Sequence, residues 1–376
     1  MKKRIYTYFF NEFIRYFTIV IFALAAITWT VQAVNLLDLV IEDGHAFRVY
    51  FLYSSLTLVK IITKLFPFSF LIATILTISK FEKDNELIVL WTSGLNKIHV
   101  VNLVFRISLM VMILQLILTS LINPTSLNYA RSLVKSSQLQ FVPSLLIEKQ
   151  FNDTVKGLTI FVDEKKENGE YKNIFIRDDG KILTTISNNA STIFAKTGYI
   201  SEDDKNLILL NGNIQRSEND GTINIISFKK TSINLSGIST KTISEPKIQE
   251  ISSFEIIRCM SLQFYNRDTS SCRYGKNYLD TKIEINKRLG MPFFIPLISL
   301  VCCFLLSSRK DNKFYFYNKY IYFFLGFVIL VASEISVRYS GLSWNHTFFY
   351  YLIPILLIPV FYFLLLKTFK YENLGL

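Results

Sequence analysis

Four long runs without a charged side chain constrain this chain more than any other feature. These uncharged runs are residues 16–37, 107–130, 289–308 and 347–366. An α-helix needs about 20 apolar residues to cross the hydrocarbon core of a bilayer. Two shorter apolar segments complete the set: 65–79 needs residues before Lys64 to span, and 320–337 spans only if it carries Glu334. The sequence therefore predicts six membrane-spanning helices.

The region between the third and fourth spans is polar and has the pattern of β-structure. Short apolar runs recur at 158–162, 174–176, 182–186, 207–210 and 223–228. Turn signals rich in Asn, Asp and Gly separate them, at 167–169, 178–180, 211–212 and 219–221. This spacing predicts an all-β sandwich, jellyroll or barrel, with either a closed core or an apolar cleft for acyl chains.

The predicted fold is a membrane α-helical bundle of six transmembrane helices with an inserted all-β domain. We expect three domains: 1–124 with the first three spans, 125–282 as the β domain with its linkers, and 283–376 with the last three spans. Ser252 followed by Glu255 is a capping-box order, which predicts a linker helix that leads back to the membrane.

The net charge of +12 follows the predicted topology. Lys and Arg gather before the first span, between the second and third, between the fourth and fifth, and after the sixth, whereas the opposite loops hold few. This is the positive-inside pattern, so we expect cytoplasmic termini and residues 125–282 on the outer side of the membrane. The first run is too long for a typical signal peptide, so we expect it to be retained. The basic excess is topological and does not indicate nucleic-acid binding.

Motifs for catalysis or metal binding are absent from the sequence. His45, His99 and His346 have no ligand spacing, and no phosphate-binding loop of the ATPase type is present. The acidic pairs 178–179 and 203–204 are interpreted as solvated turn residues. We expect no catalytic residue, no metal and no cofactor, so any transport must draw its energy from a partner.

The four cysteines indicate little about function. Cys302 and Cys303 lie inside the fourth span, where cysteine behaves as a small apolar residue. Cys259 and Cys272 could pair in an oxidising compartment, although we favour unpaired structural roles.

One segment between the second and third spans, residues 80–94, predicts a short helix. Asp84 or Asn85 can cap it, Gly94 can end it, and Glu86 lies in its first turn, where the helix dipole favours an anion. Its apolar residues share one face: Leu87, Leu90 and Trp91. Such a stripe fits either the groove of a soluble partner or the bilayer surface.

Several short motifs occur in an order shared with a known family. They are Arg15-Tyr16, Leu37-Asp38-Leu39 with Gly44, Phe66-Pro67-Phe68 with 71–74, Asn85-Glu86-Leu87 with Ser93-Gly94, Asn123-Pro124, and 284–288 leading to Pro292 and Pro296. With the layout of three spans, a β insert and three spans, the chain resembles the LptF/LptG lipopolysaccharide export permeases over nearly its whole length. Of the two subunit types, we expect LptF.

The resemblance implies a transport role, partners and a location. Relatives are the inner-membrane permease subunits of an ABC transporter, powered by two copies of an LptB-like ATPase and paired with a second LptG-like or LptF-like subunit. They extract lipopolysaccharide and pass it through a periplasmic jellyroll to LptC- and LptA-like proteins toward the outer membrane.

The resemblance also assigns candidate site residues. The ATPase-coupling helix would contain Glu86, Leu87, Leu90, Trp91 and Gly94. A substrate gate or cavity would involve Arg48, Arg288, Glu334 and Arg338. This chain departs from relatives that carry basic residues at the outer end of the first helix, since Asn35, Asp38, Glu42 and Asp43 occupy that region. For Glu334, a pair with Arg338 at i+4 and a substrate role are both open.

Two other classes of function remain open from the residues alone. A membrane-anchored sensor or assembly factor would bind a lipid or protein ligand with its β domain and would need no ATPase. A membrane enzyme acting on lipid would need a polar catalytic cluster at the membrane face, and the sequence offers none.

Overall fold

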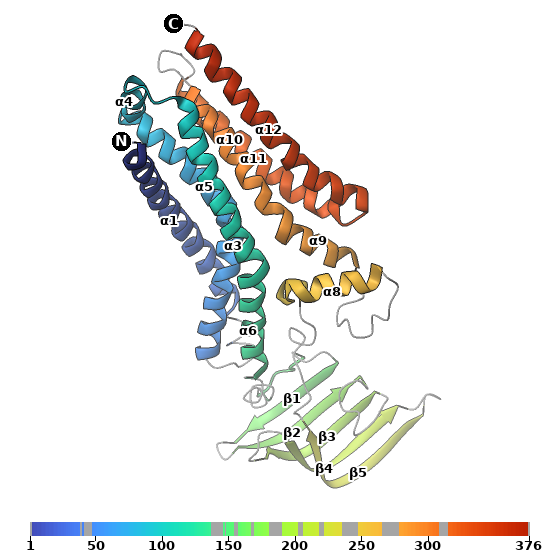
Figure 1. The fold of residues 1–376 in the computed structure, drawn as a ribbon. Coiled ribbons are helices and arrows are strands. Elements are labelled where there is room, and N and C mark those ends of the chain that lie inside the picture. The colour runs from blue at the N-terminus through green and yellow to red at the C-terminus, as the bar shows by residue number, and fades with distance from the viewer. Residues whose placement is uncertain are drawn as a thin grey trace. The chain divides into compact units, whose positions relative to one another are not determined.

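The computed structural model divides into two compact units (Figure 1). The helical unit comprises Met1–Thr30, Thr57–Asn128 and Lys247–Leu376, and the strand unit comprises Val31–Leu56 and Tyr129–Pro246. The residues that the structure describes are 2–37, 40, 47–136, 146, 148–153, 157–166, 169–179, 190–201, 206–217, 222–234, 247–264, 278–307 and 315–374.

Six helices in the described part of the chain are long and apolar enough to cross a membrane, which confirms the prediction. Four are continuous or nearly so: α1 (Lys2–Asn35), α3 (Phe47–Lys83), α11 (Tyr315–Ser340) and α12 (Trp344–Leu374). The third span runs from α5 (Lys97–Ile117) through a π-helical turn, η1 (Leu118–Ile122), into α6 (Asn123–Ser136). The fourth runs from α9 (Tyr278–Gly290) through η4 (Met291–Phe293) into α10 (Phe294–Cys303) and η5 (Phe304–Ser307).

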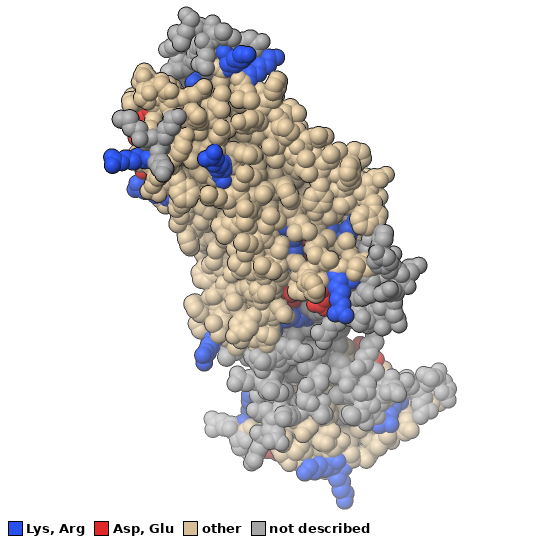
Figure 2. All heavy atoms as spheres, in the orientation of Figure 1, with Lys and Arg blue, Asp and Glu red and all other residues tan. Residues whose placement is uncertain are grey.

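Helix α10 is the centre of the helical unit. All ten of its residues are buried, and it contacts α5, α11 and α12. Cys302 and Cys303 are free thiols within it, as predicted. In contrast, α1, α11 and α12 expose large apolar side chains, and Figure 2 shows a broad belt of the helical unit without charged side chains. This surface suits a lipid environment.

Five strands form one antiparallel sheet in the order β1-β2-β3-β4-β5, which confirms the β prediction. They are β1 (Leu158–Lys165), β2 (Glu170–Asp178), β3 (Ser191–Ile200), β4 (Asn206–Ser217) and β5 (Ile223–Asn234). One face is a buried apolar core, in which Ile160, Ile176 and Ile193 are cross-strand neighbours. Phe161, Phe175 and Phe194 are paired in the same way in the alternating register.

Three details of the predicted β region are wrong. Strand β3 was not predicted, because Thr, Ala and Lys interrupt its apolar residues. The Asn211-Gly212 signal lies inside β4 instead of in a turn. Asp178 is fully buried at the end of β2 and is not a solvated turn residue. The predicted strand 182–186, the turn at 219–221 and the acidic pair 203–204 lie outside the described residues.

Two asparagines bend neighbouring strands around Lys196 of β3. Asn173 in β2 and Asn211 in β4 have φ values of 48° and 53°, in the left-handed region. The pairing of β2 with β3 and of β3 with β4 skips these two positions and Lys196. Asparagine visits this conformation more readily than other residues with a side chain. The Asn-Gly signal therefore produces a bend within a strand.

The predicted linker helix is α8 (Ser253–Phe264). Ser252 caps it as expected, since the Glu255 N–H donates to Ser252 Oγ at 3.2 Å. Cys259 on this helix is disulfide-bonded, so the unpaired role favoured from the sequence is wrong for this residue. Cys272 lies outside the described residues.

Replacing Gly212 with alanine should destabilise the sheet, because the new Cβ would lie 2.0 Å from the Phe194 carbonyl oxygen. Overpacking of this kind costs about 1–3 kcal/mol. The measurement is thermal unfolding of the purified full-length protein in detergent, combined with protease cleavage within 157–234. Ser227→Ala, at an exposed position of β5, is the matched control. Wild-type resistance of Gly212→Ala would contradict this close approach.

Candidate functional site

A polar cavity of about 250 Å³ lies within the helical unit. It is formed by α3, the α5–η1–α6 span, α9 with η4, α11, and the 3-10 turn η3 (Ile248–Glu250). Its charged lining residues are Lys60, Lys64, Glu284, Lys287, Arg288 and Glu334. Its uncharged polar residues are Thr63, Gln115, Thr119, Asn123 and Gln249. Ionisable groups at membrane depth are costly and mark functional sites.

Three prolines explain why polar groups gather here. Proline has no N–H, so the helix carbonyl four residues before it loses its usual donor. Pro67, Pro124 and Pro292 stand in this relation to the carbonyls of Thr63, Ser120 and Arg288. Side chains from other segments donate to all three: Gln115 Nε2 to Thr63 at 2.9 Å, Ser253 Oγ to Ser120 at 2.7 Å, and Thr119 Oγ1 to Arg288 at 2.9 Å.

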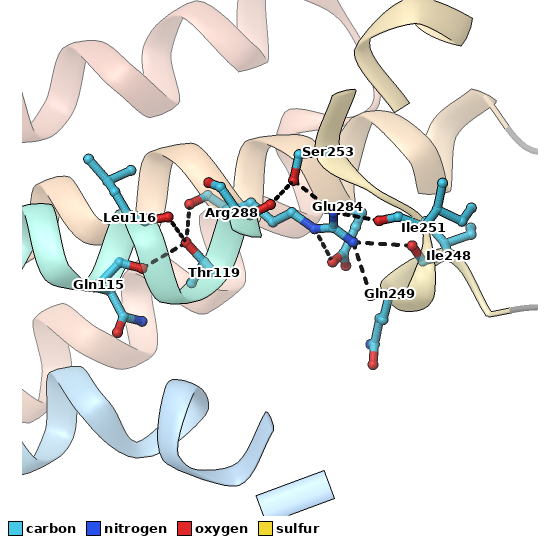
Figure 3. Close-up of polar contacts among 10 residues, drawn as sticks. Gln115, Leu116, Thr119, Ile248, Gln249, Ile251, Ser253, Glu284 and Arg288 are labelled. Atoms are coloured by element: carbon cyan, nitrogen blue, oxygen red, sulfur yellow. Dashed lines mark hydrogen bonds and ion pairs between the residues drawn. The ribbon is translucent and has the colours of Figure 1, made fainter. Parts of the chain in front are cut away.

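The Arg288 guanidinium uses all five of its N–H groups within the chain (Figure 3). Its Nε donates to Glu284 Oε1 at 2.9 Å. Its terminal nitrogens donate to the carbonyls of Ile248 (3.2 Å), Gln249 (3.1 Å) and Ile251 (2.8 Å) and to Ser253 Oγ (2.9 Å). The side chain is 3% exposed. Arg288 therefore lines the cavity with every donor already engaged.

Glu334 on α11 forms an ion pair with Lys287 on α9. Among the described residues nothing joins Glu334 to Arg338, which is exposed on α11, so the partner expected at i+4 is not the one found. Together with the Arg288–Glu284 pair, this contact neutralises both carboxylates of the cavity.

Two lysines and two side-chain oxygen atoms of the cavity lining have no ion-pair or hydrogen-bond partner among the described residues. Within the described part of the chain, Lys60 and Lys64 have no ion pair, and their i, i+4 spacing places them on one face of α3. Gln115 Oε1 and Asn123 Oδ1 are buried without a hydrogen-bond partner there. The cavity therefore offers excess positive charge beside unsatisfied acceptors.

The segment expected to contact an ATPase forms helix α4 (Glu86–Thr92). Leu87 is buried, and Leu90 and Trp91 are partly buried against the core of the helical unit. The predicted apolar stripe thus seats α4 on the bundle. The exposed apolar side chains of α4 are Ile88 and Val89, at 48% and 65% exposure.

The ends of α4 differ in part from the sequence-based expectation. Asn85 precedes the helix in a left-handed conformation and makes no capping hydrogen bond with its side chain. Gly94 has φ of 81°, and its N–H donates to the Trp91 carbonyl at 3.1 Å, as expected for a helix end. Glu86 in the first turn accepts a hydrogen bond from the Tyr8 hydroxyl at 3.1 Å.

The structure brings together only some of the predicted gate residues. Arg288 and Glu334 line the cavity, whereas Arg338 does not. Arg48 is exposed near the start of α3, in the strand unit. Asp38, Glu42 and Asp43 lie outside the described residues. Among the described residues no group of three or more His, Cys, Asp or Glu side chains is placed to hold a metal ion.

Sequence reasoning missed the cavity lysines Lys60, Lys64 and Lys287. A signal for the first two was present, because they interrupt the second span at i, i+4. Charges placed so regularly within a membrane helix indicate a polar interior face.

Residues 7–368 match the family described as Lipopolysaccharide export system permease LptF/LptG. The chain belongs to this family. Its six candidate spans make it a multi-pass membrane protein, and the family description covers both LptF and LptG. A protein of Rickettsia prowazekii (strain Madrid E), named Uncharacterized protein RP871, is 27% identical over 237 residues, which are 62% of this chain and 64% of that protein. The chain thus matches less than two thirds of that relative's length.

A double-mutant cycle should detect the pair between Lys287 and Glu334. Lys287→Met and Glu334→Leu each leave one charge unpaired, so together they should cost roughly 1 kcal/mol less than the sum of the single changes. The measurement is thermal stability in detergent. The cycle of Glu334→Leu with Arg338→Met is the control and should be additive. Coupling in the control cycle but not in the first would overturn the observed pairing.

Proposed function

We propose that this LptF/LptG family member is the transmembrane permease subunit of an ABC transporter that extracts lipopolysaccharide from the bacterial inner membrane. A separate LptB-like ATPase in two copies powers extraction, and a second permease subunit completes the transport path. LptC- and LptA-like proteins receive the lipid and carry it toward the outer membrane. The chain supplies the transport path and performs no catalysis. Family membership, six spans and the inserted sheet support this proposal.

The proposed topology follows the charge distribution. Both termini are cytoplasmic, and the central domain, 125–282, is periplasmic, between spans in 1–124 and 283–376. The clusters of Lys and Arg at alternate loops of the sequence support this orientation.

The observation that carries the proposal is the polar cavity with two lysines that have no ion pair among the described residues. Both carboxylates of the lining are neutralised by Lys287 and Arg288, which leaves Lys60 and Lys64 as its excess charge. A phosphate group carries about two negative charges near neutral pH. Lys60 and Lys64 are thus candidate contacts for lipopolysaccharide phosphates, in a chain whose sequence is acidic just after the first span.

The sheet is the exit path in this proposal. Its buried face is apolar on every strand, with Ile160, Ile176, Ile193, Leu209 and Ile233 as examples. Acyl chains leaving the membrane need such a surface, because exposing them to water is unfavourable.

Helix α4 is the proposed contact with the ATPase. Its stripe of Leu87, Leu90 and Trp91 holds it on the bundle, while Ile88 and Val89 point away from that core and supply an apolar contact surface. Exposed apolar groups on a short, seated helix are typical of helix-in-groove recognition.

Removing both cavity lysines should weaken binding of lipopolysaccharide by about tenfold or more, since each charge-assisted contact contributes on the order of 1.5–3 kcal/mol. The measurement is binding of purified lipopolysaccharide, and of its dephosphorylated form, to Lys60→Ala/Lys64→Ala. The variant should lose the wild-type preference for the phosphorylated lipid. Lys60→Arg/Lys64→Arg preserves the charge and should retain the preference, as should Lys230→Ala on β5. Equal preference in the double alanine variant and wild type would refute the phosphate role.

Glu86→Ala should lower both co-purification with the ATPase and lipopolysaccharide release, about fivefold or more if Glu86 is a principal contact. Tyr8→Phe is the matched control, because it removes the hydrogen bond to Glu86 and leaves the carboxylate. It should bind the ATPase normally. Undiminished binding and release in Glu86→Ala would sink the coupling assignment.

A further inference from the structure

Residues 247–253, called the strap here, contain one 3-10 turn and the first residue of α8. The strap begins the last segment of the helical unit and leads directly into α8. Its single turn, η3, has three hydrogen bonds of its own: Glu250 N–H to the Lys247 carbonyl at 2.8 Å, Ile251 N–H to the Ile248 carbonyl at 3.3 Å, and Lys247 N–H to Glu250 Oε2 at 3.1 Å. One turn of helix is not stable by itself. Contacts with the bundle must therefore keep the strap in place.

Arg288 of α9 provides most of these polar contacts. Four of its five N–H groups go to the carbonyls of Ile248, Gln249 and Ile251 and to Ser253 Oγ. A cation at the last carbonyls of a helical turn also meets the negative end of the turn dipole. Apolar contacts join the same elements, because Ile251 and Ile256 pack on Ile285 of α9.

The network continues from Arg288 to the third span. Thr119 Oγ1 of η1 donates to the Arg288 carbonyl at 2.9 Å, and Ser253 Oγ donates to the Ser120 carbonyl at 2.7 Å. Figure 3 shows the Arg288 side chain extended between these two groups of contacts, with the strap carbonyls at its tip. The third span, α9 and the strap are therefore tied at one point, and Gln249 of the strap lines the cavity.

Stability alone is a poor reason for this arrangement. Burying a guanidinium carries a desolvation penalty, and well-packed apolar residues often replace buried ion pairs without loss of stability. The planar guanidinium instead fixes geometry, because its five donors form a rigid fork and each acceptor must lie in a defined direction from it.

We propose that Arg288 is a positioning residue that transmits displacement of α9 at the cavity to the strap and α8. The strap follows the 125–246 segment in sequence, so it is one of the covalent routes from the cavity wall toward the strands, beside the one through α6. This inference rests on the proposed function, in which a lipid held at the cavity must be handed on. Arg288 acts through the strap and has no free donor for the lipid itself.

Hydrogen exchange of the purified full-length protein tests directly whether Arg288 holds the strap. The reporters are the hydrogen-bonded amides of Glu250, Ile251, Glu255 and Ile256. Arg288→Lys should speed exchange at these amides about tenfold relative to α10, because the loss of one charge-assisted hydrogen bond is sufficient for that factor. Ser253→Ala leaves the arginine in place and should give the same selective effect, which covers the case in which Arg288→Lys does not fold.

Asn286→Ala is the matched control on the same helix. Asn286 is buried and donates to Ser340 Oγ at 2.9 Å, toward α11 and away from the strap. It should lower stability without selective exchange at the strap. Wild-type exchange of the strap amides in folded Arg288→Lys and Ser253→Ala would overturn the claim that Arg288 holds the strap. Equal acceleration in Asn286→Ala would overturn it as well.

Transport assays in proteoliposomes with the ATPase and bridge proteins separate transmission from binding. Ser253→Ala, which changes no residue of the cavity lining, should keep photocrosslinking of lipopolysaccharide to the cavity within about twofold of wild type, while release falls about tenfold. An equal fall in binding and release would overturn the transmission role. Failure of the wild-type chain to bind lipopolysaccharide would refute the proposed function, while the exchange result would still decide whether Arg288 holds the strap.

Discussion

A backbone carbonyl without a donor is costly inside a bilayer, and this constraint organises the helical unit. Prolines at 67, 124 and 292 deprive three carbonyls of their helical donors, and Gln115, Ser253 and Thr119 replace those donors from other segments. The residues that repair the helices are thus the same residues that line the polar cavity or adjoin it. The cavity is a consequence of how broken helices are satisfied, and its two lysines on α3, Lys60 and Lys64, take no part in that repair.

The layout of the fold could be predicted from the sequence because its signals are local. Uncharged runs of bilayer length identify the six spans, and short apolar runs between turn signals identify most strands. Strand β3 was missed because its alternate residues are small or polar, and its register is set by β2 and β4. Asn211-Gly212 was misread because the same left-handed preference serves a turn or a bend, and only the neighbouring strands decide which.

The candidate site could be predicted only in part because its contacts join distant segments. Spacing along α11 left Arg338 open as a partner of Glu334, but the ion pair is made with Lys287 of α9. Arg288 was predicted as a gate or cavity residue, yet nothing local indicates that the residues from 248 to 253 would occupy its donors. Lys60 and Lys64 were visible as charges in a membrane span, but their role depends on which carboxylates are already paired.

Helix α4 has only seven residues and little stiffness of its own. Its contacts with neighbouring helices hold it in place. Glu86 is bonded to Tyr8 of α1, the stripe of α4 rests on the bundle core, and Lys97 lies over the rings of both Trp91 and Phe369 of α12. A partner that displaced α4 would therefore disturb contacts with both α1 and α12. The position of this short helix is therefore coupled to the positions of both α1 and α12.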